Sequence, residues 1–275
     1  ITAYGLGEQA SSAVSPNQIT LTRPDREKDI QRLISYAIGN MMGRYSLDHP
    51  GLIYAHAGNI GFDPTRYPTF PADQDGILPV TDLPWFSDDA AHRIREFLLA
   101  VWGQATIAEN LHWLADSLGR KPEETPEDAI RRYIATGFYK DHLQTYKKRP
   151  IYWLFSSGKQ KAFEALVYLH RYNEGTLSRM RTEYVVPLTG KMNDRIRFLS
   201  EEVPKATSTP ERKKLEKDID RLKKKLDELR LFDEKLRHYA DRRIGLDLDD
   251  GVKVNYGKFG DLLAEVKAVT GGSEE

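Results

Sequence analysis

The sequence predicts a mostly α-helical protein, in which a helical domain with few short strands is followed by a long antiparallel coiled-coil hairpin. Apolar residues recur at three- and four-residue steps through much of residues 24–145, as they do in amphipathic helices. Two more stripes of this kind fill the C-terminal third, joined by a short breaker that begins and ends near proline. One run, Ile151–Phe155, has the composition of a strand.

The N-terminal part divides into a tail and the start of the helical domain. Residues 1–22 are small, polar and without periodicity, which predicts a tail or linker. The helical domain is predicted over residues 23–172 and opens with a helix at Pro24. Residues 49–86 are rich in proline and glycine, so we expect an irregular loop there, with a short strand at Leu52–Tyr54.

Capping residues mark the helices that follow. Ser87 is predicted to cap one helix with two aspartates in its first turn, and Thr106 to form a capping box with Glu109. Thr125 precedes Pro126 at the first position of another helix. After the strand, a helix is expected over about Gln160–Tyr172.

Residues 173–245 predict the hairpin. Its helices are expected at Thr176–Val203 and Pro210–Arg243, with the turn at Lys205–Thr209. The hairpin would serve either as an arm for a partner chain or DNA backbone, or as a structural strut with solvated charges, which is the simpler explanation. Residues 246–275 predict a turn, a short strand at Val252–Val254 and a closing helix.

Composition excludes several classes of protein. Lys+Arg and Asp+Glu number 41 each, so electrostatic targeting depends on local patches. Without cysteine there is no disulfide framework, thiolate metal site or cysteine nucleophile, and the histidines lack metal-ligand spacing. The sequence shows no membrane span or signal peptide, so a soluble cytoplasmic protein is expected. A start at Ile1 is in keeping with a piece of a longer protein.

One stretch, Tyr146–Val186, interleaves positive charge with aromatic residues more densely than any other. Cations neutralise phosphates and rings offer flat contact area, so this mixture suits a nucleic-acid surface. The simpler alternative is a buried core strand with a solvated basic flank. The candidate DNA-binding residues are Lys147, Lys148, Arg149, Lys159, Lys161 and Arg171.

Two acidic clusters near the C-terminus are weaker candidates. A calcium loop starting at Asp247 would need an acidic twelfth residue, but that residue is Lys258, so a polar turn is expected. Asp261 with Glu265–Lys267 has the residue types of a metal-dependent nuclease, but these residues follow a helical pattern rather than a strand. No catalytic, cofactor-binding or metal-binding residue is therefore assigned.

Three long segments carry a resemblance to a known family: Asp29–Ala55, Arg149–Val186 and Gly245–Leu263. They resemble the C-terminal region of PglX-type proteins, the adenine-specific DNA methyltransferases of BREX phage-exclusion systems. The resemblance covers nearly the whole chain after about Ile19.

This resemblance implies a role in phage defence on double-stranded DNA, with other phage-exclusion proteins as possible partners. In the family, S-adenosylmethionine binds upstream at a glycine-rich turn, and an Asn-Pro-Pro-Tyr/Phe motif grips the flipped adenine. Neither motif occurs in residues 1–275, so no cofactor is expected in this chain. The resemblance thus implies a non-catalytic region that helps position the enzyme on DNA and docks partners. The alternative is a protein–protein assembly module that uses the hairpin without touching DNA.

Overall fold

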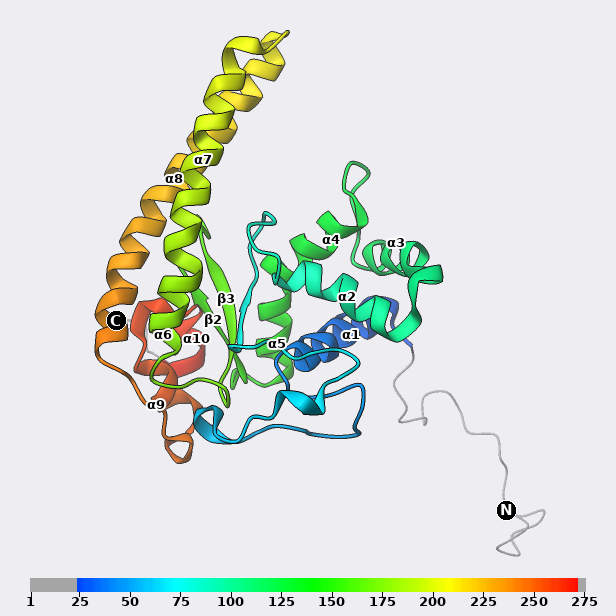
Figure 1. The fold of residues 1–275 in the computed structure, drawn as a ribbon, viewed down its shortest axis with the longest axis vertical. Coiled ribbons are helices and arrows are strands. Elements are labelled where there is room, and N and C mark those ends of the chain that lie inside the picture. Colours follow the sequence, from blue (N-terminus) through cyan, green and yellow to red (C-terminus); the bar gives the residue numbers. More distant parts are fainter. Residues whose placement is uncertain (1–23, 272–275) are drawn as a thin grey trace, which may run out of the picture.

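The computed structural model describes residues 24–271, and the predicted tail over residues 1–22 lies outside them. Helices dominate, as predicted, around one small sheet (Figure 1). The elements are α1 (Arg26–Met41), β1 (Ile77–Pro79), α2 (Ala90–Trp102), α3 (Ile107–Ser117), α4 (Pro126–Tyr133), α5 (Tyr139–Thr145), β2 (Tyr152–Ser156), β3 (Glu164–Tyr168), α6 (Thr176–Arg179), α7 (Val186–Glu202), α8 (Thr209–Asp241), α9 (Gly251–Gly257) and α10 (Val266–Thr270).

The sheet is antiparallel in the order β1-β3-β2, with Trp153 opposite Val167 and Leu78 opposite Leu166. The strand predicted at Ile151–Phe155 is confirmed as β2. The helix predicted over Gln160–Tyr172 is wrong, because its apolar centre forms the middle strand β3 and pairs along both edges. A short, fully apolar run fits a buried strand or a buried helix equally well, and long-range pairing decides here.

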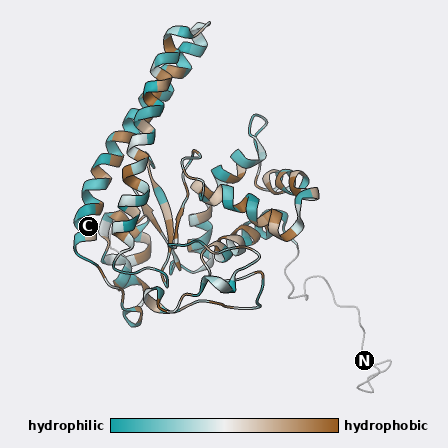
Figure 2. Ribbon diagram, viewed as in Figure 1, coloured by the Kyte–Doolittle hydropathy of each residue, from teal (hydrophilic) through white to brown (hydrophobic). Residues whose placement is uncertain are grey.

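Strand β2 is buried from Tyr152 to Phe155 because both of its faces are covered. Tyr152 stacks on His142 of α5, with ring centroids 5.0 Å apart. Trp153 points the other way and meets Tyr256 of α9 edge-on at 5.3 Å. Figure 1 shows the sheet between the hairpin and C-terminal helices on one side and α1–α5 on the other, and Figure 2 shows its hydrophobic colouring. These aromatic residues therefore belong to the core, as the simpler sequence interpretation held.

Helix starts follow the capping chemistry only in part. Thr125 and Asp128 form the reciprocal capping box of α4, as expected from Thr125-Pro126. Helix α2 begins two residues later than predicted, because Asp89 rather than Ser87 accepts the hydrogen bond from the amide of His92. Thr106 caps α3 without a side-chain bond to the helix start, since its hydroxyl donates back to the carbonyl of Trp102.

The irregular segment 49–86 is tied to the core by tertiary hydrogen bonds. The strand predicted at Leu52–Tyr54 is wrong, because among residues 24–271 only Ile53 makes a backbone bond there, to Arg44, and no strand pairs with this segment. The segment's strand is β1 instead. Tyr168 of β3 donates its hydroxyl to the carbonyl of Tyr54 at 2.8 Å, which ties the loop to the sheet.

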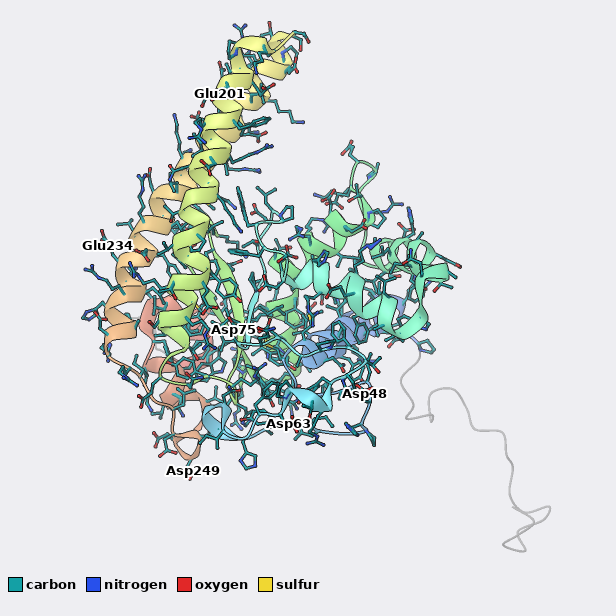
Figure 3. The ribbon with its side chains drawn as sticks, in the orientation of Figure 1. Asp48, Asp63, Asp75, Glu201, Glu234 and Asp249 are labelled. Carbon is teal, nitrogen blue, oxygen red and sulfur yellow. The ribbon has the colours of Figure 1, made fainter. Side chains whose placement is uncertain are left out.

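The long helices α7 and α8 lie side by side and antiparallel, which fits the predicted hairpin, while its coiled-coil character stays a prediction (Figure 1). Figure 3 shows Glu201 near its tip and Glu234 nearer its base. Buried α8 residues follow the predicted stripe: Ile219, Leu222, Leu226, Leu229, Phe232 and Leu236. At the base, Glu228 of α8 accepts hydrogen bonds from the amides of Gln160 and Ala162, which ties α8 to the β2–β3 turn.

The predicted C-terminal strand at Val252–Val254 is wrong, because these residues lie in α9. A helix there buries Tyr256 one turn later, and the Tyr256 hydroxyl meets that of Tyr139 at 2.7 Å. Most buried hydrophobic side chains from Ile30 to Val269 form one contiguous cluster, and Leu199, Ile219 and Leu222 form a second, smaller one between α7 and α8.

Candidate nucleic-acid interface

The basic run Lys147–Arg149 closes the C-terminal end of α5. The amide of Lys147 donates to the carbonyl of Gln144 at 3.1 Å, and that of Lys148 to Leu143 at 2.7 Å. This is the Schellman arrangement, which glycine usually completes because the backbone turns left-handed there. Lys147 and Lys148 have φ values of 49° and 61°. Two lysines thus occupy positions where glycine would cost less.

Five cations around this turn are exposed and lack an acidic partner among the residues that the structure describes. They are Lys140 on α5, Lys147, Lys148 and Arg149 after it, and Lys159 in the β2–β3 turn. Several other exposed cations on the helices, such as Arg197 beside Asp194, are paired with a carboxylate within one helical turn, whereas others, such as Lys213 and Lys214 on α8, are not paired within the described residues. Cations without such partners bind phosphate by releasing counterions rather than by breaking an ion pair.

Part of this charge faces one groove of about 740 Å³ between α5, the end of β2 and α10. We call it the lysine groove, since Lys140, Lys147, Lys148 and Lys161 line it. Glu164 and Glu265 also contribute to its wall. The structure therefore brings three of the six predicted DNA-binding residues to one hollow. Arg149 and Lys159 are exposed but do not line it.

Lys161 is less available for a ligand than its neighbours. Its ammonium lies 3.2 Å from a carboxylate oxygen of Glu164 and donates to the carbonyl of Ala135 at 2.9 Å. Glu164 is buried, and burial raises the pKa of its carboxyl group, while the cation of Lys161 opposes this rise. Lys161 therefore stabilises a buried carboxylate at the groove wall.

The prediction that Arg171 lies on this surface is wrong, because its side chain is completely buried. Its guanidinium donates to the carbonyls of Asp73 (2.5 Å) and Gln74 (2.8 Å) and to the side chain of Asn59 (3.0 Å), and it covers the ring of Phe62. Arg171 is thus a core anchor for the irregular segment. Buried arginines need such partners, because an unpaired buried charge is very costly.

Lys140 is the groove residue that the sequence analysis missed. A signal for it exists, because Lys140, Gln144 and Lys147 follow one another at three- and four-residue steps opposite the apolar residues of α5. The buried Tyr139 and Leu143 define the inward face, which leaves Lys140 exposed.

The other sites considered from sequence remain structural. Asp247 accepts a hydrogen bond from the amide of Asp249, as expected of a polar turn. Asp261 pairs with Lys235 of α8. Within residues 24–271 no group of three or more acidic or histidine side chains is placed to hold a metal ion. Across the same residues, no helix has the length and apolar character needed to cross a membrane.

Comparison with known proteins identifies relatives but no matching family model. The chain is 56% identical over 265 residues to the adenine-specific methyltransferase BrxX of Escherichia coli O9:H4 (strain HS), a match that covers 93% of this chain and 22% of that protein. It is 41% identical over 273 residues to the adenine-specific methyltransferase PglX of Lacticaseibacillus casei (strain Zhang), covering 98% of this chain and 22% of that protein. The chain therefore spans about a fifth of the length of these relatives, and the predicted resemblance to PglX-type methyltransferases is confirmed.

Proposed function

We propose that this chain, which is homologous to a region of PglX-type adenine-specific methyltransferases, is a non-catalytic region that helps seat such an enzyme on duplex DNA. The observation that carries the proposal is the set of exposed, unpaired cations around the end of α5, of which Lys140, Lys147 and Lys148 enter one groove. The names of its relatives supply the context of adenine methylation.

The chemistry of this surface suits the DNA backbone rather than the bases. Lysine ammonium groups act as compact point charges that satisfy phosphates without reading sequence. Their placement on a helix end and the adjoining turn fixes them relative to the sheet. Binding through them would set the position of the enzyme on the duplex and leave base recognition to other parts.

The residues described here do not fit S-adenosylmethionine, the cofactor that the family implies. A methyltransferase holds it at a glycine-rich turn, whereas the turn Ser157–Lys161 after β2 returns directly into antiparallel β3. The amides of Gln160 and Ala162 in this turn are already taken by Glu228. We therefore propose that the chain does not bind the cofactor. Calorimetric titration tests this, and stoichiometric micromolar binding would contradict it.

The test of DNA seating is the salt dependence of binding to a duplex, measured by fluorescence anisotropy. Each phosphate contact contributes about 0.9 to the slope of log affinity against log salt concentration. Replacing Lys147, Lys148 and Arg149 together by alanine should flatten the slope by up to roughly 3. The fold should survive, because exposed charges contribute little to stability, and circular dichroism checks this.

A matched control comes from three exposed lysines near the hairpin tip, Lys213, Lys214 and Lys217. Their triple alanine variant removes the same charge and should leave the slope unchanged. A flattened slope in this control, with an unchanged slope in the α5 variant, would place the DNA on the hairpin instead.

A second candidate function is assembly with a partner protein. It is supported by the large apolar side chains that the hairpin exposes, Phe198 (50% exposed) and Leu231 (62% exposed). Partner proteins bury such side chains more readily than a DNA backbone does. If the unmodified chain fails to bind duplex DNA even at low salt, DNA seating is refuted and this second function is favoured.

A further inference from the structure

The wall of the lysine groove contains a buried carboxylate that is balanced by two lysines from different parts of the chain. Glu164 of β3 lines the groove and is only 3% exposed. One of its oxygens accepts a hydrogen bond from the hydroxyl of Ser156 at 3.0 Å, and the other lies 3.2 Å from the ammonium of Lys161. Burial raises the pKa of the Glu164 carboxyl group, and the cations of Lys161 and Lys225 oppose this rise. A carboxylate in such a place needs a cation nearby, because an uncompensated buried charge is costly.

The second of these lysines, Lys225, comes from the hairpin. It lies on α8, is 4% exposed and does not line the groove, so it has no contact with a ligand there. Its ammonium lies 2.7 Å from a carboxylate oxygen of Asp82 and donates to the backbone carbonyl of Lys161 at 3.4 Å. The charge of Lys225 acts on Glu164 through the protein interior, where charges interact more strongly than in water.

Lys161 differs from this buried lysine because its side chain is 46% exposed and lines the groove. A lysine ammonium on its flexible stem rotates readily between partners. Lys140, Lys147 and Lys148 line the same hollow, so a phosphate that they attract also meets the ammonium of Lys161. Lys161 therefore has two alternative partners, Glu164 in the wall and a phosphate in the groove.

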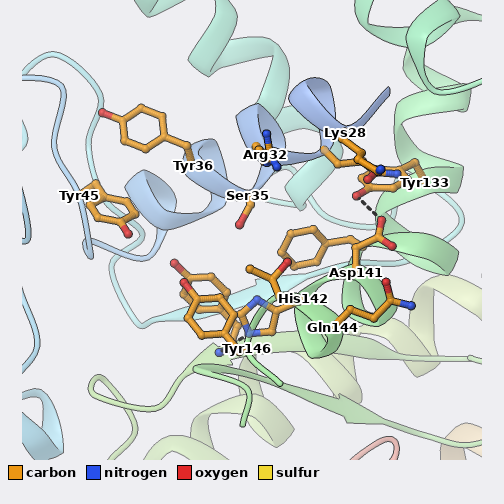
Figure 4. Close-up of a pocket in the computed structure, with 14 residues that line it drawn as sticks. Lys28, Arg32, Ser35, Tyr36, Tyr45, Tyr133, Asp141, His142, Gln144 and Tyr146 are labelled. Atoms are coloured by element: carbon orange, nitrogen blue, oxygen red, sulfur yellow. Dashed lines mark hydrogen bonds between the residues drawn. The ribbon is translucent and has the colours of Figure 1, made fainter. Parts of the chain in front are cut away.

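The other carboxylates near the groove do not hold Lys161. Glu265, the second acidic residue of the groove wall, is exposed and forms no ion pair among the residues that the structure describes. Asp141, the acidic residue of α5, points into a separate aromatic hollow, where it accepts the hydroxyl of Tyr133 at 2.8 Å (Figure 4). The carboxylate from which a ligand must draw Lys161 is therefore that of Glu164.

We propose that Lys161 exchanges Glu164 for a phosphate of the DNA backbone, and that Lys225 then balances the charge of Glu164 in its place. Lys225 makes the exchange possible, because a carboxylate left in the wall without any cation would oppose it. The hairpin thereby regulates the groove, which presents Lys161 to DNA only when Lys225 is in place. By the reciprocity of linked equilibria, DNA in the groove strengthens the attachment of α8 to the sheet by the same free energy. This inference rests on the proposed function, since the phosphate belongs to the DNA seated at the groove.

The test measures the salt slope of duplex binding, by fluorescence anisotropy, in variants of the two lysines. Lys161→Ala should flatten the slope by about 0.9, the contribution of one phosphate contact. Lys225→Met and Lys225→Gln should each flatten it by about the same 0.9, although Lys225 touches no DNA, because Lys161 then stays with Glu164. Adding Lys161→Ala to either Lys225 variant should have no further effect.

The variants are chosen so that the fold is kept. Met retains an apolar stem at position 225, and Gln can still donate a hydrogen bond to Asp82; thermal unfolding followed by circular dichroism checks both. Lys224→Met is the matched control, because it removes the same charge from an exposed position one residue earlier on α8, and it should leave the slope unchanged. Glu164→Gln removes the carboxylate that holds Lys161, so in this background Lys225→Met should no longer flatten the slope.

The outcomes separate this inference from DNA seating. Salt-dependent binding with a slope that Lys161→Ala leaves unchanged would mean that Lys161 stays with Glu164, which would overturn the exchange and leave DNA seating intact. A full slope in the folded Lys225 variants would overturn it as well. Additive effects of Lys161→Ala and Lys225→Met, or an equal effect of Lys224→Met, would show that Lys225 acts only as a distant charge and would also overturn it. Complete absence of DNA binding by the unmodified chain would refute both proposals together.

Discussion

The pH dependence of stability offers a quantitative check on the environment of His142. Burial and the nearby cation of Arg44 lower the pKa of His142 from 6.5 to about 3. In the unfolded chain the same imidazole binds a proton below about pH 6.5. Between these values the unfolded state holds one more proton than the folded state, so acidification favours unfolding. Stability from the neutral ring is complete above pH 6.5 and is lost as the pH falls towards 3.

The magnitude follows from the linkage slope of about 1.4 kcal/mol per pH unit. Between pH 6.5 and 4.5 the proton uptake of His142 on unfolding should lower the free energy of unfolding by about 2.5 kcal/mol. The backbone amides of Ile151 and Tyr152 donate hydrogen bonds to Nε2 of His142. The variant His142→Gln removes the titrating imidazole and keeps an amide oxygen that can accept these two hydrogen bonds. Other titrating groups are common to both proteins, including His170, whose pKa burial also lowers. They cancel in the difference between the two profiles.

The measurement is urea unfolding of both proteins at several pH values from 7.5 to 4.5, analysed by linear extrapolation. The unmodified chain should lose about 2.5 kcal/mol more than His142→Gln over this range. The variant's stability at pH 7.5 is immaterial, because only the difference in slope reports on His142. Parallel profiles would mean that His142 is solvated or takes up its proton in the folded state, and the burial argument would then fail.

Three further predictions concern stability and binding. Arg171→Leu should destabilise the fold by about 3 kcal/mol in urea unfolding, because the acceptor oxygens of Asp73, Gln74 and Asn59 lose the hydrogen bonds of a completely buried guanidinium, and a change below about 1 kcal/mol would contradict the burial of Arg171. Lys147→Gly should raise the melting temperature, since glycine relieves a left-handed strain of about 1 kcal/mol, while flattening the DNA salt slope by about 0.9; a lower melting temperature would contradict the strain. Leu222→Ala and Leu226→Ala should each cost ~2–5 kcal/mol by thermal or urea unfolding, against less than about 0.5 for the exposed Lys224→Ala, and equal effects would show that the stripe is not the packed seam.

Local signals in the sequence were enough for the longer helices and the hairpin, because their patterns repeat over several turns, but not for the short helix α9. The leucine stripe of α8 is an example. Its three- and four-residue spacing places Leu222 and Leu226 on one helix face, and this face is buried. Strand β3 could not be assigned this way. Its apolar run has no period, and the strands that pair with it are set by contacts with residues as far away as Ile77.

The candidate site shows the same division. Exposure of Lys147 and Lys148 followed from their position after the last apolar residue of α5. Burial of Arg171 did not, because the acceptors that hold it lie about a hundred residues earlier in a segment without periodicity. The burial of His142 had no local signal either. Its Nε2 accepts hydrogen bonds from the amides of Ile151 and Tyr152, and its Nδ1 has no partner within the described residues.

The link between α8 and the β2–β3 turn has a mechanical consequence. With 33 residues, α8 forms a stiff rod about 50 Å long. Its Glu228 grips the turn through the amides of Gln160 and Ala162, and its Lys225 reaches the carbonyl of Lys161 at 3.4 Å. A sideways load at the tip is therefore delivered by leverage to the short turn that carries Lys159 and Lys161. A force on the tip of α8 would therefore act on the backbone of the β2–β3 turn, at the edge of the lysine groove.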